Sequence, residues 1–300
     1  MTGRRRPPGP GALRVVLLVA VVAAVLFGVL GSGALTGFHP VRTAASSATD
    51  LPPGPTRDNR AAHAYPHGLR VAALGDSVTS GAHCDCDAFP AVYGRLLAQQ
   101  TGVPVHVDNL GVGGLGSAGL LQSLEDPTSP EARAVADADV VVVTIGANDF
   151  GDHHAEVTSG QCAATAGDDC VADEMAAMRS HVRAILDRAR SLRHGQPSSV
   201  LVTGYWNVFE DGDVARASFP ASGRAATIQL TLRANAAIRA AAQQTGATYV
   251  DLYRPFQDRP GGPTGLLADD GDHPSASGHA VTARVLMAAG LPGLPALPER

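Results

Sequence analysis

The sequence contains no lysine, and all 23 of its basic residues are arginine. Aromatic residues make up only 4% of the chain, so a folded core must be mainly aliphatic. Positive charge is concentrated at one end, where residues 1–70 carry eight Arg and two Asp, a net of +6. With the whole chain at −5, the remainder carries −11. This acidic remainder has no basic stripe, which argues against nucleic-acid binding.

The sequence also lacks an internal repeat, and its composition changes near both ends. Residues 39–68 are rich in Pro, Ala, Ser, Thr and Arg without any period, and we interpret them as a linker. Pro292, Pro295 and Pro298 prevent a helix from continuing through the tail, residues 291–300. The 45% apolar and 17% charged residues are typical of a globular protein. One folded domain is therefore predicted for residues 69–290.

The first 38 residues have the composition of an export segment. Arg4, Arg5 and Arg6 precede residues 15–30, which are all apolar or Gly. Such a run, extendable to residue 35, falls between the core of a signal peptide and a membrane-spanning helix. The Arg cluster should stay in the cytoplasm and direct the rest of the chain outward. We therefore predict an extracytoplasmic protein, either anchored in the membrane by one N-terminal helix or secreted.

Of these two possibilities we favour the uncleaved anchor. No A-x-A cleavage site follows the apolar run directly, and the nearest stretch of small residues is 44–48. A buried core helix is the least favoured interpretation, because it does not explain the three Arg that precede the run.

Within residues 69–290, short apolar runs alternate with helical patterns. Residues 140–145 contain four consecutive Val and indicate a strand buried on both faces. Residues 175–192 place apolar side chains at a spacing of three to four, which predicts a helix. The predicted strands are 69–74, 105–110, 140–145, 200–203 and 248–252, and the predicted helices are 88–101, 175–192, 227–245 and 275–289. This alternation predicts a three-layer α/β/α sandwich with a five-stranded parallel sheet, whose site lies beyond the carboxyl ends of the strands.

Two of the motifs at these strand ends could together make a nucleophile and its base. Gly75-Asp76-Ser77 follows the first strand directly, where a Ser hydroxyl would be exposed and its N–H would lie at a helix start. Asp270-Gly271-Asp272-His273-Pro274 follows the last strand. A Ser nucleophile needs a base, and the base needs a carboxylate that fixes its tautomer. Taken singly, the first motif is more simply an N-cap Ser and the second a polar loop.

Two further motifs follow the second and third strands. The stretch 109–114 reads Asn-Leu-Gly-Val-Gly-Gly, and its glycines would let backbone N–H groups approach a ligand closely. Gly146-Ala147-Asn148-Asp149 follows the run of Val, and the Asn148 side chain can donate from its N–H₂ group. Each is otherwise an ordinary turn.

Together, these four blocks resemble in order and placement those of the SGNH hydrolases, also called GDSL esterases and lipases. The likeness spans residues 70–290 and implies a flavodoxin-like sheet and hydrolysis of carboxylic esters through an acyl-enzyme, without a cofactor or metal. It implies that Ser77 is the nucleophile, that His273 is the base and later the acid, and that Asp270 orients His273. The oxyanion donors would be the Ser77 N–H, the Gly114 N–H and the Asn148 side chain.

For two of the site residues that the resemblance implies, the sequence offers an alternative residue. Gly111 is the alternative to Gly114, because the Gly-rich stretch permits a shift in the alignment. Asp272 competes with Asp270, although its closeness to His273 in sequence makes it harder to fold back onto the ring. The first block reads Gly-Asp-Ser-Val where the family name has Leu, so the looser SGNH label fits better.

The sequence predicts an ester substrate without distinguishing between classes of ester. The expected partner is a small-molecule, lipid or glycan ester, and the chain is expected to be a monomer. Alternatives are a carbohydrate acetylesterase, an acyltransferase of the same fold, and a surface binding protein without catalysis. An enclosed apolar groove would favour lipids, and a shallow polar one acetylated sugars.

Other polar or aromatic residues are weaker candidates. Asp149, Asp152, His153 and His154 suggest a metal site, but a di-His loop of this kind is more often solvated. His83 is a candidate substrate contact because it lies near Ser77. The segment 205–207 holds the only Trp and would form either a pocket wall or plain packing.

The four cysteines are expected to form disulfides, because an exported chain meets an oxidising compartment. The strand order that the resemblance implies makes the first and third strands neighbours. We therefore predict at least one bridge joining the Cys84/Cys86 pair to the Cys162/Cys170 pair. A local Cys162–Cys170 bridge is the alternative, whereas Cys84–Cys86 would close a very small ring. Four thiolates on one metal ion are disfavoured.

Overall fold

The computed structural model of the protein describes residues 65–295. The predicted export segment, residues 1–38, lies outside this range, as do most of the predicted linker and the last five residues. Between residues 65 and 295, no helix combines the length and the apolar character needed to cross a membrane. The first described residue, Tyr65, is already buried against the core.

Five parallel strands form one sheet in the order β2-β1-β3-β4-β5, as predicted. All five residues of β3, four Val and one Thr, are buried, because helices cover both faces of the sheet, and these β-branched side chains suit a strand. The register pairs Val71 with Val140 and Val141 with Val200. The strands are β1 (Leu69–Gly75), β2 (Val105–Gly111), β3 (Val140–Thr144), β4 (Ser199–Thr203) and β5 (Thr248–Val250).

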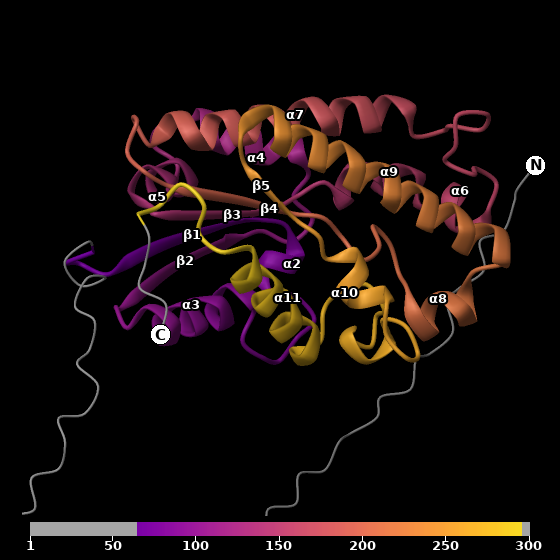
Figure 1. Ribbon diagram of the computed structural model, residues 1–300. Helices are drawn as coiled ribbons and strands as arrows, with labels where there is room; N and C mark the ends of the chain where they lie inside the picture. Colours follow the sequence, from indigo (N-terminus) through magenta and orange to yellow (C-terminus); the bar gives the residue numbers. More distant parts are fainter. Residues whose placement is uncertain (1–64, 296–300) are drawn as a thin grey trace, which may run out of the picture. The chain divides into compact units, whose positions relative to one another are not determined.

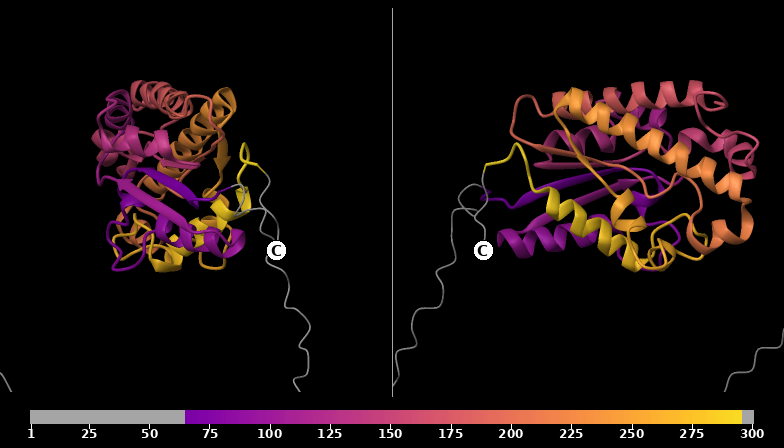
Figure 2. Two further views of the ribbon diagram at one scale, coloured as in Figure 1. Left: turned by 90° about the vertical axis from the view of Figure 1, so that its left-hand side faces the viewer. Right: turned by 45° about the vertical axis from the view of Figure 1, so that its right-hand side comes forward.

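Helices cover the sheet on both faces, which confirms the three-layer α/β/α sandwich (Figures 1 and 2). One face carries α2 (Ser77–Ser80), α3 (Phe89–Thr101), α10 (Tyr253–Gln257) and α11 (Ala276–Ala289). The other carries α4 (Ser117–Glu125), α5 (Pro130–Asp137), α7 (Ala172–Leu192) and α9 (Ala221–Thr245). The remaining short elements are η1 (Ala147–His153), α6 (His154–Ser159), α8 (Gly212–Ser218) and η2 (Thr264–Leu266).

Several helical segments differ from the sequence-based expectation, and three of them are long enough to cover the sheet. The helix α9 begins at Ala221, six residues before the predicted start, because its first turns bury only the small residues Gly223 and Ala226 and show little apolar periodicity. The helices α4 and α5, which connect β2 to β3, were not predicted at all. A signal for α5 is present, since Ser129 caps the helix by accepting the Ala132 N–H at 2.9 Å and Pro130 occupies its first position.

The predicted disulfide between the two cysteine pairs is wrong. Cys84 bonds to Cys86 and Cys162 bonds to Cys170, with Cα–Cα distances of 5.1 and 6.0 Å that both lie within the usual range. The local Cys162–Cys170 alternative therefore forms, and so does the Cys84–Cys86 bridge, which was not expected because of its small ring. Although β1 and β3 are neighbours, the loops that follow them lead to opposite faces of the sheet. The Cys84–Cys86 sulfurs lie close to a ring nitrogen of His279 on α11, whereas the other loop is held by α9.

Candidate active site

The turn after β1 places Ser77 at the carboxyl edge of the sheet. Gly75 has φ +141°, and a Cβ there would lie 1.9 Å from the Thr144 carbonyl oxygen, so no other residue fits. Asp76 then caps α2 by accepting the Val78 N–H at 3.0 Å. Ser77 is the first residue of α2, so its N–H has no partner within the helix, and its side chain is partly exposed.

The Asp76 carboxyl beside Ser77 is buried and has an unusual electrostatic environment. Its side chain is 1% exposed and accepts a hydrogen bond from the Tyr205 hydroxyl, which follows β4. Burial raises the pKa of Asp76 to about 7, although the hydrogen bonds from Tyr205 and Val78 and the charge of His273 oppose the rise. This carboxyl is therefore a structural support of the Ser77 turn that titrates near neutrality.

Asp270 and His273 form the hydrogen-bonded pair that the sequence suggested. Asp270 Oδ2 lies 2.7 Å from His273 Nδ1, while Asp270 Oδ1 accepts the backbone N–H groups of Asp272 and His273, each at 3.0 Å. Burial would raise the pKa of Asp270, but these two N–H groups and the imidazole outweigh it and hold that pKa below its ordinary value. The competing Asp272 lies farther away, with its Oδ2 3.7 Å from the same ring nitrogen.

Ser77 and His273 lie near opposite ends of the folded domain in sequence. A positive charge on His273 lowers the pKa of Asp76, the residue before Ser77, so the two side chains are within electrostatic range of one another. Across residues 65–295, no hydrogen bond joins the Ser77 hydroxyl to His273, and such bonds are often long in free enzymes. The side chain of His273 is 12% exposed, so one edge of the ring still faces solvent.

The structure distinguishes the two candidate oxyanion glycines. The Gly111 N–H donates to Asn109 Oδ1 at 3.1 Å, and a Cβ at Gly111 would lie 2.2 Å from the backbone nitrogen of Ser80. Gly111 is therefore required for packing β2 against α2, and its donor is occupied. Gly114 lies in an exposed turn with φ +75° and open space around it, and within the described part of the chain its N–H makes no hydrogen bond.

Asn148 adds a side-chain donor at the same edge of the sheet. It is exposed, and its Nδ2 donates to the Leu115 carbonyl at 3.1 Å, which leaves the second N–H of the amide free. Leu115 directly follows Gly114, so this hydrogen bond fixes the amide beside the Gly114 turn. The free donors of Ser77, Gly114 and Asn148 thus come from the ends of three neighbouring strands.

A second hydrogen-bonded group, missed by sequence reasoning, holds this turn in place. Asp149 accepts from both the backbone N–H and the hydroxyl of Ser117, the first residue of α4. The Ser117 hydroxyl also lies 3.0 Å from His181 Nδ1 on α7. The residues are 32 and 64 positions apart, so no local signal could have found them. The segment that contains Tyr205 was expected to form a pocket wall or plain packing, and its contact with Asp76 was not predicted.

The weaker candidates from the sequence analysis make contacts that do not join them in one site. His153 pairs with Glu156 and Glu174, whereas His154 pairs with Glu210, so the two rings do not converge on one metal site. Trp206 is buried and stacked on Phe256, with ring centroids 4.5 Å apart, which is plain packing.

His83 lies against the Asp270–His273 pair. Its ring stacks on His273 with centroids 4.5 Å apart, and its Nδ1 is 3.3 Å from Asp270 Oδ2. The resulting group of His83, Asp270 and His273 offers three potential metal-ligand atoms within 4.8 Å of one another.

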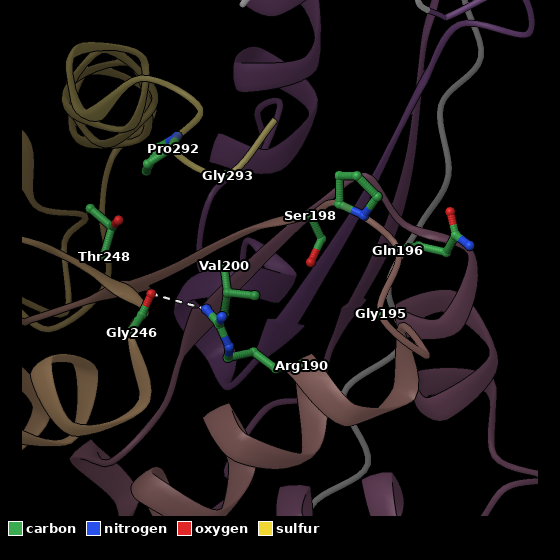
Figure 3. Close-up of a pocket in the computed structure, with 10 residues that line it drawn as sticks. Arg190, Gly195, Gln196, Ser198, Val200, Gly246, Thr248, Pro292 and Gly293 are labelled. Carbon is green, nitrogen blue, oxygen red and sulfur yellow. Dashed lines mark hydrogen bonds between the residues drawn. The ribbon is translucent and has the colours of Figure 1, made fainter. Parts of the chain in front are cut away.

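An open hollow of about 430 Å³ borders the pair, and most of its lining is polar: His83, Cys84, Asp85, Leu267, Ala268, Asp269, Asp270, Ser275 and Ala276. Another hollow of about 380 Å³ lies at the amino edge of the sheet, before β4 and β5 (Figure 3). It is lined by Arg190, Gly195, Gln196, Ser198, Thr248 and Gly293, among others, and by no His, Asp or Glu. Arg190 itself donates to the Gly246 carbonyl at 3.0 Å. This second hollow lacks groups for acid–base chemistry.

Comparisons with known proteins agree with the geometry. Residues 73–281, more than half of the chain, match the model of the GDSL-like Lipase/Acylhydrolase family. No curated protein matches the sequence significantly. Among solved structures, the lipase Lip_vut3 from a goat rumen metagenome is similar, with a TM-score of 0.60 and 18% identity over 74% of this chain and 97% of that one. The acetylxylan esterase Axe2 from Geobacillus stearothermophilus gives a TM-score of 0.53 and 17% identity, covering 76% and 97%. At identities this low, the two structures show that the fold is shared, and they do not indicate a shared substrate.

Proposed function

Because the chain belongs to the GDSL-like lipase/acylhydrolase family and is a carboxylic ester hydrolase of the SGNH type, we propose that it works through an acyl-enzyme on Ser77. The observation that carries this proposal is the 2.7 Å contact between Asp270 Oδ2 and His273 Nδ1. A carboxylate at this nitrogen favours the tautomer with the proton on Nδ1, which leaves Nε2 free to accept a proton. The lowered pKa of Asp270 keeps its carboxyl ionised for this task.

The reaction then proceeds in two halves. His273 Nε2 takes the Ser77 hydroxyl proton as Oγ attacks the ester carbonyl, and the proton passes to the leaving alcohol as the acyl-enzyme forms. Water, activated by the same imidazole, releases the acid and restores Ser77. The N–H groups of Ser77 and Gly114 and the Asn148 amide would stabilise the negative oxygen of both tetrahedral intermediates.

The proposed substrate is a short-chain acyl ester of a polar alcohol, such as an acetylated sugar. Its support is the open, mostly polar lining of the hollow beside Asp270, which offers little apolar surface to a long acyl chain. On a series of p-nitrophenyl esters, we expect kcat/KM to be highest for acetate and to fall towards octanoate. A maximum at long chains would instead support a lipase.

A fluorophosphonate probe tests the mechanism directly. It should label the wild-type protein at Ser77 and leave the Ser77→Ala variant unlabelled, whereas a binding protein without catalysis would not be labelled. Adding an alcohol acceptor to the assay tests acyl transfer, because a transferase would form a new ester where a hydrolase forms acid.

We also propose export, with residues 15–35 as an uncleaved anchor and the catalytic domain acting as a monomer outside the cytoplasmic membrane. The support is the Arg4–Arg6 cluster before the apolar run. Fractionation with N-terminal sequencing tests this, and a mature protein in the medium that starts near residue 45–50 would show cleavage instead. Sedimentation of the soluble domain tests the monomer.

A further inference from the structure

The stack of His83 on His273 is one part of the site that the ester mechanism leaves without a role. The two rings are nearly parallel, at 22°, and their centroids are 4.5 Å apart. The His83 and His273 Nδ1 atoms both point to Asp270 Oδ2, at 3.3 and 2.7 Å. One carboxylate oxygen is therefore shared by two imidazoles, of which only His273 is used in catalysis.

The loop that carries His83 is tied to the nucleophile turn. The N–H groups of Gly81 and Ala82 both donate to the Ser77 carbonyl, at 3.1 and 3.0 Å. His83 itself has φ +59°, a left-handed conformation that residues other than Gly and Asn adopt rarely. The Cys84–Cys86 disulfide closes the next turn. The chain thus accepts an unfavourable backbone conformation at the residue whose ring covers His273.

We propose that His83 is a positioning residue for the triad: its imidazole covers one face of the His273 ring and holds that ring against Asp270. This inference rests on the proposed function of the same site. The side chain of His83 is 60% exposed against 12% for His273, so His83 is the outer ring of the stack and shields the base from solvent.

Two substitutions separate the polar contact with Asp270 from the aromatic stack. His83→Phe keeps an aromatic ring over His273 but loses the contact with Asp270. His83→Asn keeps a polar side chain near Asp270, tolerates the left-handed backbone, and loses the stacked ring. The matched control is His106→Asn on β2, because His106 is 63% exposed and pairs with Asp108 at 3.0 Å, outside the site.

The experiment measures kcat and KM on p-nitrophenyl acetate, using the disulfide-intact chain. The kcat of His83→Phe should fall about three- to tenfold with KM within about twofold, because the His273 ring is less well positioned. His83→Asn, which loses the stacked ring, should lower kcat at least as much, and His106→Asn should leave both constants unchanged.

A kcat within about twofold of the wild-type value in both His83 variants would overturn the proposal, as would a change confined to KM, which would make His83 a substrate contact. Melting temperatures check folding, and His83→Asn carries the test if His83→Phe does not fold. Failure of the proposed function is recognised separately, because the wild type itself would then lack Ser77 labelling, and both ideas would fall.

Discussion

The two edges of the sheet have hollows of similar size but very different chemistry. The carboxyl edge carries Ser77, Asn148 and the Asp270–His273 pair, and a hollow of about 430 Å³ borders Asp270. The amino edge has a hollow of about 380 Å³ whose one charged group, Arg190, already donates to the Gly246 carbonyl (Figure 3). Parallel strands explain the difference, because every strand delivers the residue that follows it to the same edge. Cavity volume alone therefore does not identify the active site, whereas strand direction does.

The largest difference between the edges is expected for their serines. Ser77→Ala should lower kcat on the order of 10⁴-fold or more, because it removes the nucleophile. Ser198→Ala, in the amino-edge hollow, should change kcat by less than about twofold. Steady-state kinetics on p-nitrophenyl acetate measures both, and near-normal turnover in Ser77→Ala would remove the central claim.

The amide side chains of the two edges provide the next test. Asn148→Ala should lower kcat by roughly 10²–10³-fold with little change in KM, because its N–H₂ stabilises the oxyanion more than the ground-state carbonyl. Gln196→Ala at the amino edge should be kinetically silent. If Asn148→Ala raises only KM, the side chain binds substrate without stabilising the transition state.

The free energy of unfolding should depend on pH through one buried carboxyl group at the carboxyl edge, that of Asp76. The pKa of Asp76 is about 7 in the folded chain and 3.8 in its ordinary environment, so the folded state keeps a proton that the unfolded state releases. The stability this group contributes is fully present below pH 3.8 and is lost as pH rises through about 7. The loss amounts to a few kcal/mol at most, at about 1.4 kcal/mol per pKa unit.

Asp76→Asn removes this titration. Denaturant unfolding at pH 4.5, 6 and 8 should show the wild type losing stability relative to Asp76→Asn as the pH rises. A difference between the two proteins that is constant with pH would show that Asp76 is ionised in the folded state.

The smallest expected effect compares two glycines with matched surroundings. Gly114 and Gly195 have φ +75° and +80°, and a Cβ added at either position would meet no atom within 4 Å. Replacing either with Ala should cost about 1–2 kcal/mol of stability for the left-handed backbone. Only Gly114→Ala should also lower kcat, by roughly tenfold, because a shift of its N–H weakens one oxyanion contact. Equal kcat values in the two variants would argue for another donor.

The strands and the contact between Asp270 and His273 could be predicted from the sequence, because the signals for both are local. Four consecutive Val residues indicate a buried strand wherever they occur, and Asp270 lies only three residues from His273. The supports of the site are not local. Tyr205 meets Asp76 across 129 positions, and no pattern near either residue indicates the contact.

The predicted pairing of the cysteines was wrong for a related reason. Strand order was sufficient to place β1 beside β3, but not to show which face of the sheet the following loops would reach. That choice depends on contacts such as the Phe89 N–H bonding to His279 Nδ1 at 3.1 Å, which link segments 190 positions apart. The α4 and α5 helices were missed because only three and two of their residues, respectively, are buried, so their apolar pattern is weak.

Asn109 limits how the carboxyl edge can be redesigned. Its amide donates to the Thr79 carbonyl at 2.9 Å and accepts the Gly111 N–H at 3.1 Å, so it fastens the end of β2 to the helix that starts with Ser77. The turn just beyond this fastening carries Gly114 and the Leu115 carbonyl that holds Asn148, so its length should be kept. A protein engineer could instead vary the side chain of Val112, which is 48% exposed, to recruit new acyl groups while the nucleophile keeps its place.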